Sequence, residues 1–290
     1  MRRLLPLLFV IGCHSSGQEN LGLSGQTTTI DVSKLAQPEE LVRALSLSGN
    51  DLDARLGAHK MDAASTLKLE SPAREPTTPG HEPTTGREPT TLDETFAVEA
   101  DGAGGVHLVH DNSRGNGFEA VATGGQLYTK PRYGRFVRRR VEGDNLARLR
   151  VAAETPAAAY VRLLAPWLQI HEAGAVVVAG HAGVKLTLSA RTSPSSVPNE
   201  TEPGKQWRRT LQVRYIDGDI VLDAKTGAPL QVRLEAAYGF TRDGKPVQAA
   251  LSFKQSTTSA TSAIAPPADF AELGRARPIV DKQQLLEGLK

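Results

Sequence analysis

The chain has 290 residues, a length that allows one large domain or two small ones with a sizeable β core. Hydrophobic residues make up 39% and charged residues 23%, which is typical of a globular protein with some unstructured chain. The formal net charge of +2 does not indicate nucleic-acid binding, and a single cysteine excludes a disulfide within the chain.

Residues 1–12 have the pattern of a signal peptide. Arg2 and Arg3 supply a positive start, and an apolar run from Leu4 to Ile11 follows. This run is far shorter than the roughly 18 residues that a membrane-spanning helix needs. The next feature is similar to a bacterial lipobox, formed by Val10, Ile11, Gly12 and Cys13. We therefore expect cleavage before Cys13 and acylation of its thiol, which would attach the mature chain to a membrane.

The residue after the cysteine indicates to which membrane the lipoprotein is sorted. His14 stands where Asp would mark inner-membrane retention in enterobacteria, so we predict an outer-membrane lipoprotein that faces the periplasm or the cell surface. The alternative to a lipoprotein signal is a cytosolic N-terminus in which Cys13 follows the apolar run by chance.

Residues 13–37 are predicted to be the lipidated cysteine and a flexible tether, because Gly, Ser, Thr and Gln dominate them.

A folded domain is expected over residues 38–270. Pro38 and the acidic residues after it favour a helix start, and leucines recur at helical spacing around a break at Gly49-Asn50. Residues 71–92 contain three copies of Glu-Pro-Thr-Thr, which predict a disordered insertion. This insertion is either a stalk or sugar-acceptor tract, or a neutral loop grown by repeat expansion, which we favour. Residues 271–290 are expected to be a tail with a short helix.

Most of the domain alternates apolar and polar residues with a period of two, which indicates strands with one buried face. Gly102 to Gly105 predicts a turn, and Asp217-Gly218 and Asp243-Gly244 each predict a hairpin. One helix is expected from Pro156 to Leu168, with Tyr160, Val161, Leu164, Trp167 and Leu168 on one stripe. The sequence thus predicts an α+β fold: a curved antiparallel sheet, open as a half-barrel, with a few helices on its concave face.

This layout resembles the LolA-like and LppX/LprG-like group of periplasmic carriers and lipoproteins. The element order carries the resemblance, together with the strand-turn-strand segment from Ile220 to Leu230 and the segment Ile264-Ala265-Pro266-Pro267. Two features depart from the pattern of that group, namely the Pro/Thr insertion and the long loop from Thr192 to Lys205. The resemblance implies a cavity for an acyl chain or another lipidic ligand, and no catalysis.

No motif indicates an enzyme, a metal site or a cofactor. A Gly-x-Ser-x-Gly elbow and a Walker-type loop are both missing from the sequence. His107 and His110 would point to opposite faces of a strand, and we expect them to be ordinary strand residues. His171 and His181 have no acidic partner at a useful spacing. We therefore expect no catalytic residues, no metal and no cofactor, although a hydrolase with scattered residues is a third interpretation.

The segment from Gln126 to Arg150 carries eight cationic and two acidic side chains. The guanidinium group of an arginine can donate two parallel hydrogen bonds to one phosphate. Anionic headgroups are therefore candidate partners for the four residues Arg135, Arg138, Arg139 and Arg140. The other interpretation, which we favour, is a solvated strand edge whose charge discourages pairing between sheets. Nucleic acid is not expected as a partner, because the compartment is wrong.

Two functions stay open at this level. The first is a membrane-anchored lipoprotein that binds or carries a lipid or an acylated ligand in an apolar half-barrel. The second is a structural or assembly lipoprotein that docks a protein partner in the cell envelope. An apolar cavity of several hundred Å³ would favour the first function, and a filled core with an exposed apolar patch the second.

Overall fold

The computed structural model describes residues 34–70, 89–196, 203–260 and 262–272. Several predicted features lie outside the described residues: the signal peptide, the lipobox with Cys13, and most of the tether, of the Pro/Thr segment and of the C-terminal tail.

The strands are β1 (His59–Glu70), β2 (Thr90–Ala100), β3 (Val106–Asn112), β4 (Gly117–Thr123), β5 (Gln126–Pro131), β6 (Phe136–Arg140), β7 (Leu168–Val178), β8 (His181–Ala190), β9 (Gln212–Asp223), β10 (Pro229–Arg242), β11 (Lys245–Ser259) and β12 (Phe270–Glu272). The helices are α1 (Pro38–Leu45), α2 (Gly49–Leu56), α3 (Asn145–Glu154) and α4 (Pro156–Leu164), with 3-10 turns η2 (Ala165–Trp167) and η3 (Pro203–Thr210).

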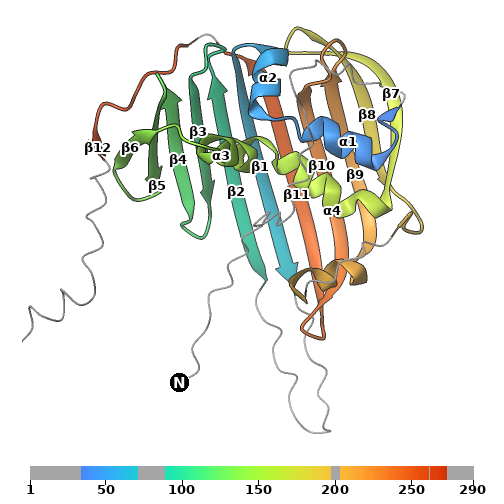
Figure 1. Ribbon diagram of the computed structural model, residues 1–290. Helices are drawn as coiled ribbons and strands as arrows, with labels where there is room; N and C mark the ends of the chain where they lie inside the picture. The colour runs from blue at the N-terminus through green and yellow to red at the C-terminus, as the bar shows by residue number, and fades with distance from the viewer. Residues whose placement is uncertain (1–33, 71–88, 197–202, 261, 273–290) are drawn as a thin grey trace, which may run out of the picture.

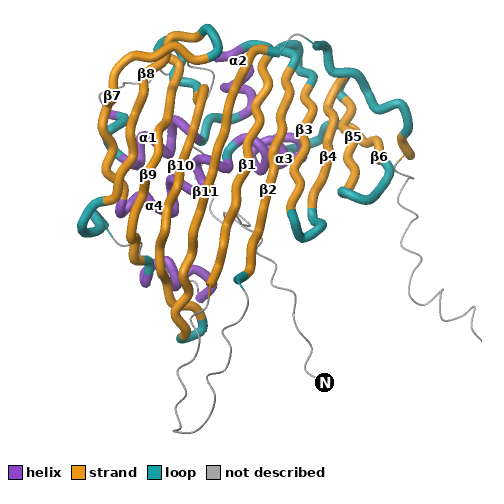
Figure 2. Tube along the Cα trace, turned by 180° about the vertical axis from the view of Figure 1, so that it is seen from behind, coloured by secondary structure: helices purple, strands orange, loops and turns teal. Residues whose placement is uncertain are grey.

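All these strands form one sheet in the order β12-β6-β5-β4-β3-β2-β1-β11-β10-β9-β8-β7. Every neighbouring pair is antiparallel except β12 and β6, which run parallel over three residues. The sheet does not close, because β12 and β7 stand at opposite ends of the order (Figure 1). The helices all lie on one face, which is hidden behind the strands in Figure 2. The predicted half-barrel with helices on one face is therefore confirmed.

Turn chemistry explains which predicted hairpins form. Asp243 and Gly244 have φ angles of 52° and 70° and join β10 to β11 in a two-residue loop. Asp217-Gly218, in contrast, lies inside β9, so the hairpin predicted there is wrong. Gly218 pairs with Leu234, and a Cβ at Gly218 would lie 2.3 Å from the carbonyl oxygen of Arg233. Glycine is needed at that position for the close approach of two strands and not for a turn.

The strand-turn-strand segment noted in the sequence forms the hairpin between β9 and β10. Asp223 Oδ1 accepts hydrogen bonds from the backbone N–H groups of Lys225 and Thr226 and from the Thr226 hydroxyl. Burial by itself would raise the pKa of Asp223, but these hydrogen bonds hold it below its ordinary value. The carboxylate therefore stays ionised and fixes the turn.

The predicted helices form, but one ends early. Helix α1 begins at Pro38 as predicted and buries Leu41, Ala44 and Leu45. Leu35 is also buried, so packed chain precedes the expected domain start at residue 38. Helix α4 ends at Leu164 instead of Leu168, because Pro166 has no N–H to donate and its ring would crowd the preceding turn.

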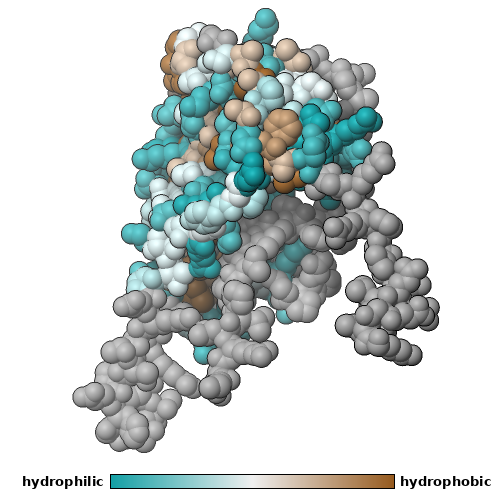
Figure 3. All heavy atoms as spheres, turned by 90° about the vertical axis from the view of Figure 1, so that its left-hand side faces the viewer, coloured by the Kyte–Doolittle hydropathy of each residue, from teal (hydrophilic) through white to brown (hydrophobic). Residues whose placement is uncertain are grey.

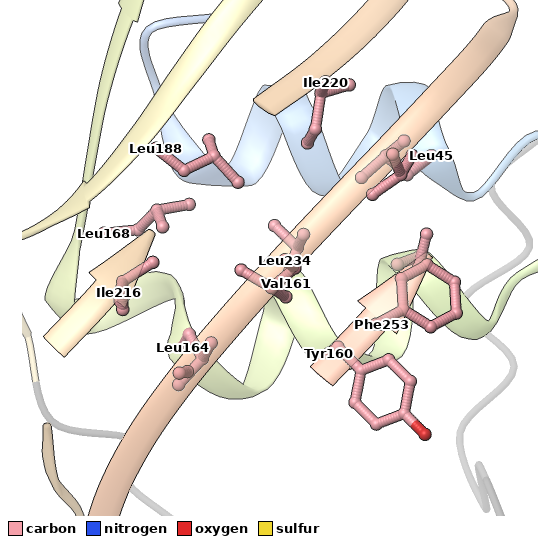
Figure 4. Packing of buried hydrophobic residues seen from close by; sticks show 14 of the residues in the cluster. Leu45, Tyr160, Val161, Leu164, Leu168, Leu188, Ile216, Ile220, Leu234 and Phe253 are labelled. Carbon is pink, nitrogen blue, oxygen red and sulfur yellow. The ribbon is translucent and has the colours of Figure 1, made fainter. Parts of the chain in front are cut away.

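Two main buried clusters lie between the helices and the sheet, and a small third one joins Leu47 and Leu52 to Ala228. The larger one joins α1 and α4 to strands β7 to β11, and Figure 4 shows its packing. Its central side chains, which include Leu45, Val161, Leu164, Leu234 and Phe253, are at most 3% exposed. The smaller cluster joins Ala153 of α3 to apolar side chains of β1 to β5, among them Val98, Leu108 and Ala120. Side chains therefore fill the space under α1 and α4.

Candidate functional site

A mostly apolar pocket lies at the end of α4, and we call it the Trp167 pocket. Its volume is about 210 Å³, and its lining consists of Leu163, Pro166, Trp167, Pro194, Ser196, Arg208, Arg209, Thr210, Leu211 and Gln212. Leu163, Trp167 and the buried Leu211 also pack against the larger core cluster. The pocket thus opens from the surface towards the main core of the domain.

Backbone hydrogen bonds fix one wall of the Trp167 pocket. Pro166 ends α4 and turns the chain into β7. The carbonyl oxygen of Pro166 accepts a bond from Ser195 N at 2.7 Å, and that of Trp167 accepts one from Arg191 N at 2.8 Å. These bonds hold the segment after β8 beside the η2 turn.

The opposite wall is η3. The Thr210 hydroxyl donates to the Trp207 carbonyl oxygen at 2.7 Å and accepts a hydrogen bond from Thr241 N at 2.7 Å. The ring of Trp207 packs against Phe240 with centroids 4.8 Å apart, and the Arg208 guanidinium lies 5.5 Å from the Trp207 centroid. No motif noted in the sequence pointed to this wall. Trp207-Arg208-Arg209 is the local signal that could have indicated an aromatic and basic surface.

The size and chemistry of the Trp167 pocket limit what it can hold. An apolar cavity of about 150 Å³ can hold a benzene ring, whereas pockets for drug-sized ligands are about 300–1,000 Å³. At about 210 Å³ the pocket suits a short apolar group, such as the end of an acyl chain. Ser196, Thr210 and Gln212 add neutral hydrogen-bonding groups to the lining.

A polar cluster interrupts the concave face beside α4, and the sequence did not indicate it. The Tyr160 hydroxyl donates to Ser65 Oγ at 2.9 Å and lies 3.5 Å from Glu94 Oε2. His110 Nε2 is 3.3 Å from Glu94 Oε1, and its ring stacks on Phe96 with centroids 4.6 Å apart. Because burial raises the pKa of Tyr160 well above its ordinary value, the phenol stays protonated. Ser65 contacts this phenol and not His110, so the serine and histidine do not form a nucleophile-base pair.

The other histidines make separate contacts. His107 Nε2 lies 2.9 Å from Glu119 Oε1 on one face of β3, and His110 faces the other side as expected. His181 Nδ1 lies 3.3 Å from Asp223 Oδ2, so the expectation that His181 has no acidic partner is wrong. Sequence spacing could not indicate this pair, because only the pairing of β8 with β9 brings Asp223 close to His181. The described residues contain no group of three or more His, Cys, Asp or Glu side chains that could hold a metal.

The basic side chains of the segment from Gln126 to Arg150 lie on three different elements, β5, β6 and α3, and in the loops between them. Arg135 Nη2 lies 2.7 Å from Asp269 Oδ1, Arg138 pairs with Glu272, and Arg139 donates to Thr129 Oγ1 at 2.7 Å. Strand β12 supplies Glu272 and covers the edge of β6. Arg138 and Arg140 share one face of β6, as an extended strand requires, and Arg139 lies on the other. The predicted charged edge is thus paired with a short strand of the same chain.

Arg150, which the sequence analysis counted in this run, is instead buried on α3. Its guanidinium contacts Asp53 of α2 through two nitrogens at 2.7 and 2.8 Å, Glu154 Oε1 at 2.6 Å and the Gly49 carbonyl oxygen at 2.9 Å. Burial raises the pKa of Glu154 to about 7, against the attraction of Arg150. Arg150 therefore joins two helices and is not available to an external anion.

Comparisons with known proteins give no family model and no curated protein that match this chain. Solved structures do match. LprF from Mycobacterium bovis is 15% identical with a TM-score of 0.25, over 80% of this chain and 98% of that one. The lipoprotein LppX from Mycobacterium tuberculosis is 11% identical with a TM-score of 0.24, over 74% and 94%. A DUF1329 family protein from Desulfovibrio piger is 10% identical with a TM-score of 0.22, over 78% and 95%. LppX bears the name of the group described in the sequence analysis.

Proposed function

We propose that this chain is a lipoprotein of the bacterial cell envelope whose half-barrel domain binds a lipidic or acylated ligand. The anchor rests on the sequence: a positive start, a short apolar run and Cys13 directly after Gly12. In the described part of the chain, no helix has the length and apolar character that a membrane span needs. His14 in place of Asp supports the outer membrane as the destination.

Acylation of Cys13 can be tested separately from ligand binding. Replacing the only cysteine by Cys13→Ser removes the nucleophile that would take the diacylglycerol. Cells fed an alkyne fatty acid should label the wild-type chain and leave the variant unlabelled. Equal labelling of both chains would overturn the lipoprotein assignment.

The observation that carries ligand binding is the Trp167 pocket. It combines an apolar interior that touches the main core with the polar side chains Ser196, Thr210 and Gln212 at its lining, which suits the apolar end of an amphiphile. Each methylene group removed from water there would contribute about 0.8 kcal/mol. At about 210 Å³ the pocket encloses the end of an acyl chain, so the rest of the ligand would lie outside it.

The two tryptophans of the chain give this proposal a direct test, because only Trp167 lines the pocket. In a Trp207→Phe variant, Trp167 is the sole tryptophan and should be quenched by a fatty acid that carries bromine near its methyl end. In the matched Trp167→Phe variant, Trp207 remains packed on Phe240 and should be quenched far less. Equal quenching of both variants, or none in either, would contradict binding in the pocket.

The alternative function, docking of an envelope protein, is favoured by a different observation. Strand β7 ends the sheet, and its outer residues from Ala173 to Val178 carry no charge, with Val177 75% exposed. Such an edge can accept an extended strand of a partner. A photo-crosslinker in place of Val177 should then give a defined protein adduct in cells. A crosslinker in place of Val151 on α3, which is 47% exposed, is the control and should give none.

A further inference from the structure

At the edge of the sheet farthest from β7, an open groove surrounds the end of β6, and we call it the arginine groove. Its volume is about 980 Å³, and its lining consists of Gln126, Arg138, Arg139, Arg140, Glu142, Asn145 and Glu272. Figure 3 views the molecule from this side, where hydrophilic residues make up most of the described surface. The Trp167 pocket involves other elements, η2, η3 and the start of β9, so the two sites cannot share one small ligand.

The groove forms where β6 stops at Arg140 and the chain turns into α3 at Asn145. Arg138 and Arg140 extend from one face of the strand and Arg139 from the other, so cationic groups from both faces meet at the strand end. The Asn145 side chain reaches back to the Arg140 carbonyl oxygen at 3.4 Å and holds this turn. Side-chain amides of Gln126 and Asn145 add neutral hydrogen-bond donors to the lining.

The three arginines differ in how firmly they are held. Arg138 donates from Nε to Glu272 Oε2 at 3.1 Å and lies 5.1 Å from the centroid of the Phe270 ring. The guanidinium of Arg139 is fixed by one neutral acceptor, Thr129 Oγ1. Within the residues that the structure describes, no carboxylate pairs with Arg140, which is exposed at the strand end. Arg139 and Arg140 therefore keep most of their donors for a ligand.

We propose that the arginine groove binds a phosphate-bearing anion, with Arg139 and Arg140 as its principal contacts. A guanidinium presents paired N–H donors that match two phosphate oxygens. Arg139 and Arg140 leave opposite faces of β6 but both line the groove, so each can contact one side of a bound phosphate. The lining is polar on every side, so an acyl chain is not the group that it takes. The phosphate can belong to a lipid headgroup or to a soluble molecule.

Glu272 competes with this anion, because its carboxylate occupies Arg138. Strand β12 pairs with β6 over only three residues, so Glu272 is held at the rim by a short ladder and by Arg138 itself. Removing this carboxylate by Glu272→Gln frees a third guanidinium. The variant therefore binds the phosphate more tightly than the wild-type chain, an effect opposite in sign to the loss of an arginine.

The test uses the full chain with Cys13→Ser in every sample, so that no acyl anchor contributes. Glycerol phosphate is the soluble probe, followed by phosphorus NMR. Vesicles of phosphatidylcholine, with or without phosphatidic acid, are the membrane probe, followed by co-sedimentation. The test variant carries Arg139→Gln and Arg140→Gln, both on exposed residues. The matched control carries Arg135→Gln and Arg148→Gln, two exposed arginines of the same run that do not line the groove.

The groove variant is expected to lose at least roughly tenfold in affinity at low salt, while the equally charged control stays close to the wild type. Loss in both assays identifies the phosphate group alone as the ligand, and loss with vesicles only identifies a headgroup in a bilayer. No binding of the wild-type chain to either probe would overturn the proposal. Equal binding by the groove variant and the control would do so too, as it would reflect net charge alone.

Discussion

Helices α1 and α4 and helices α2 and α3 are held on the same sheet by different means. Under α1 and α4, aliphatic and aromatic side chains such as Leu164, Leu234 and Phe253 pack closely, and no arginine of the described residues is buried among them. Under α3 the apolar cluster is small, and Arg150 joins α3 to α2 through Asp53 and the Gly49 carbonyl oxygen. Apolar packing is insensitive to pH and depends on volume, whereas a buried ion pair depends on which groups are ionised. The α2–α3 side should therefore respond to pH and the α1–α4 side to cavities.

The largest expected effect is on the ionic side. Arg150→Met leaves two carboxylates, Asp53 and Glu154, without their cation, and we expect it to lower the free energy of unfolding by about 3–5 kcal/mol at pH 8. Urea unfolding followed by circular dichroism measures this loss. The double change Arg150→Met with Glu154→Leu removes the buried charge as well and should recover most of the loss. If it recovers nothing, shape and not charge decides the packing of α3.

The second largest effect is expected from a mutation that creates a cavity under α1 and α4. Leu164 is fully buried between α4 and the sheet, and Leu164→Ala should cost about 2–5 kcal/mol through lost packing and a residual cavity. The same cost should be found at pH 5 and pH 8, since no titratable group depends on this side chain. Lys254→Ala, at an exposed position of β11, serves as the control and should change stability little. If the loss of unfolding free energy differed strongly between pH 5 and pH 8, the packing of α4 would also depend on an ionised group.

The third prediction concerns Glu154. Burial raises its pKa to about 7 in the folded chain, from an ordinary value of 4.5. A raised acid pKa contributes stability that is fully present below about pH 4.5 and is lost as pH rises through about 7. The loss amounts to roughly 3 kcal/mol over that window, at about 1.4 kcal/mol for each unit of pKa difference. Stability measured from pH 4.5 to pH 8 should fall less steeply in a Glu154→Gln variant. Parallel curves for the two proteins would show that Glu154 keeps its ordinary pKa.

The smallest expected effect is at the exposed ion pair of the same half. Arg135 and Asp269 lie 2.7 Å apart with more than two thirds of each side chain exposed, so solvent screens their attraction. Arg135→Ala should therefore change the thermal midpoint by only a degree or two, and added salt should abolish the difference. A loss comparable to that of Arg150→Met would mean that β12 depends on this pair for its docking.

Elements whose causes are local could be predicted from the order of amino acids alone. Alternation with a period of two predicted several of the strands, among them β3, β10 and β11, because successive side chains of a strand face opposite sides. It did not indicate β4, β7 or β12. Pro38 marked the start of α1, and Asp243-Gly244 marked a hairpin, because each fixes backbone angles within one turn. The open sheet with helices on one face followed from these elements and from the resemblance to known carriers.

Contacts between distant segments depend on how the folded chain packs and could not be predicted from local patterns. Asp217-Gly218 became part of a strand because β10 approaches it closely, and Arg150 became buried because Asp53, 97 residues earlier, faces it. The Trp167 pocket joins α4, the segment after β8 and η3, and the arginine groove joins β5, β6, α3 and β12. A local pattern shows which face of an element is apolar or charged, but the partner of that face depends on how the whole chain packs.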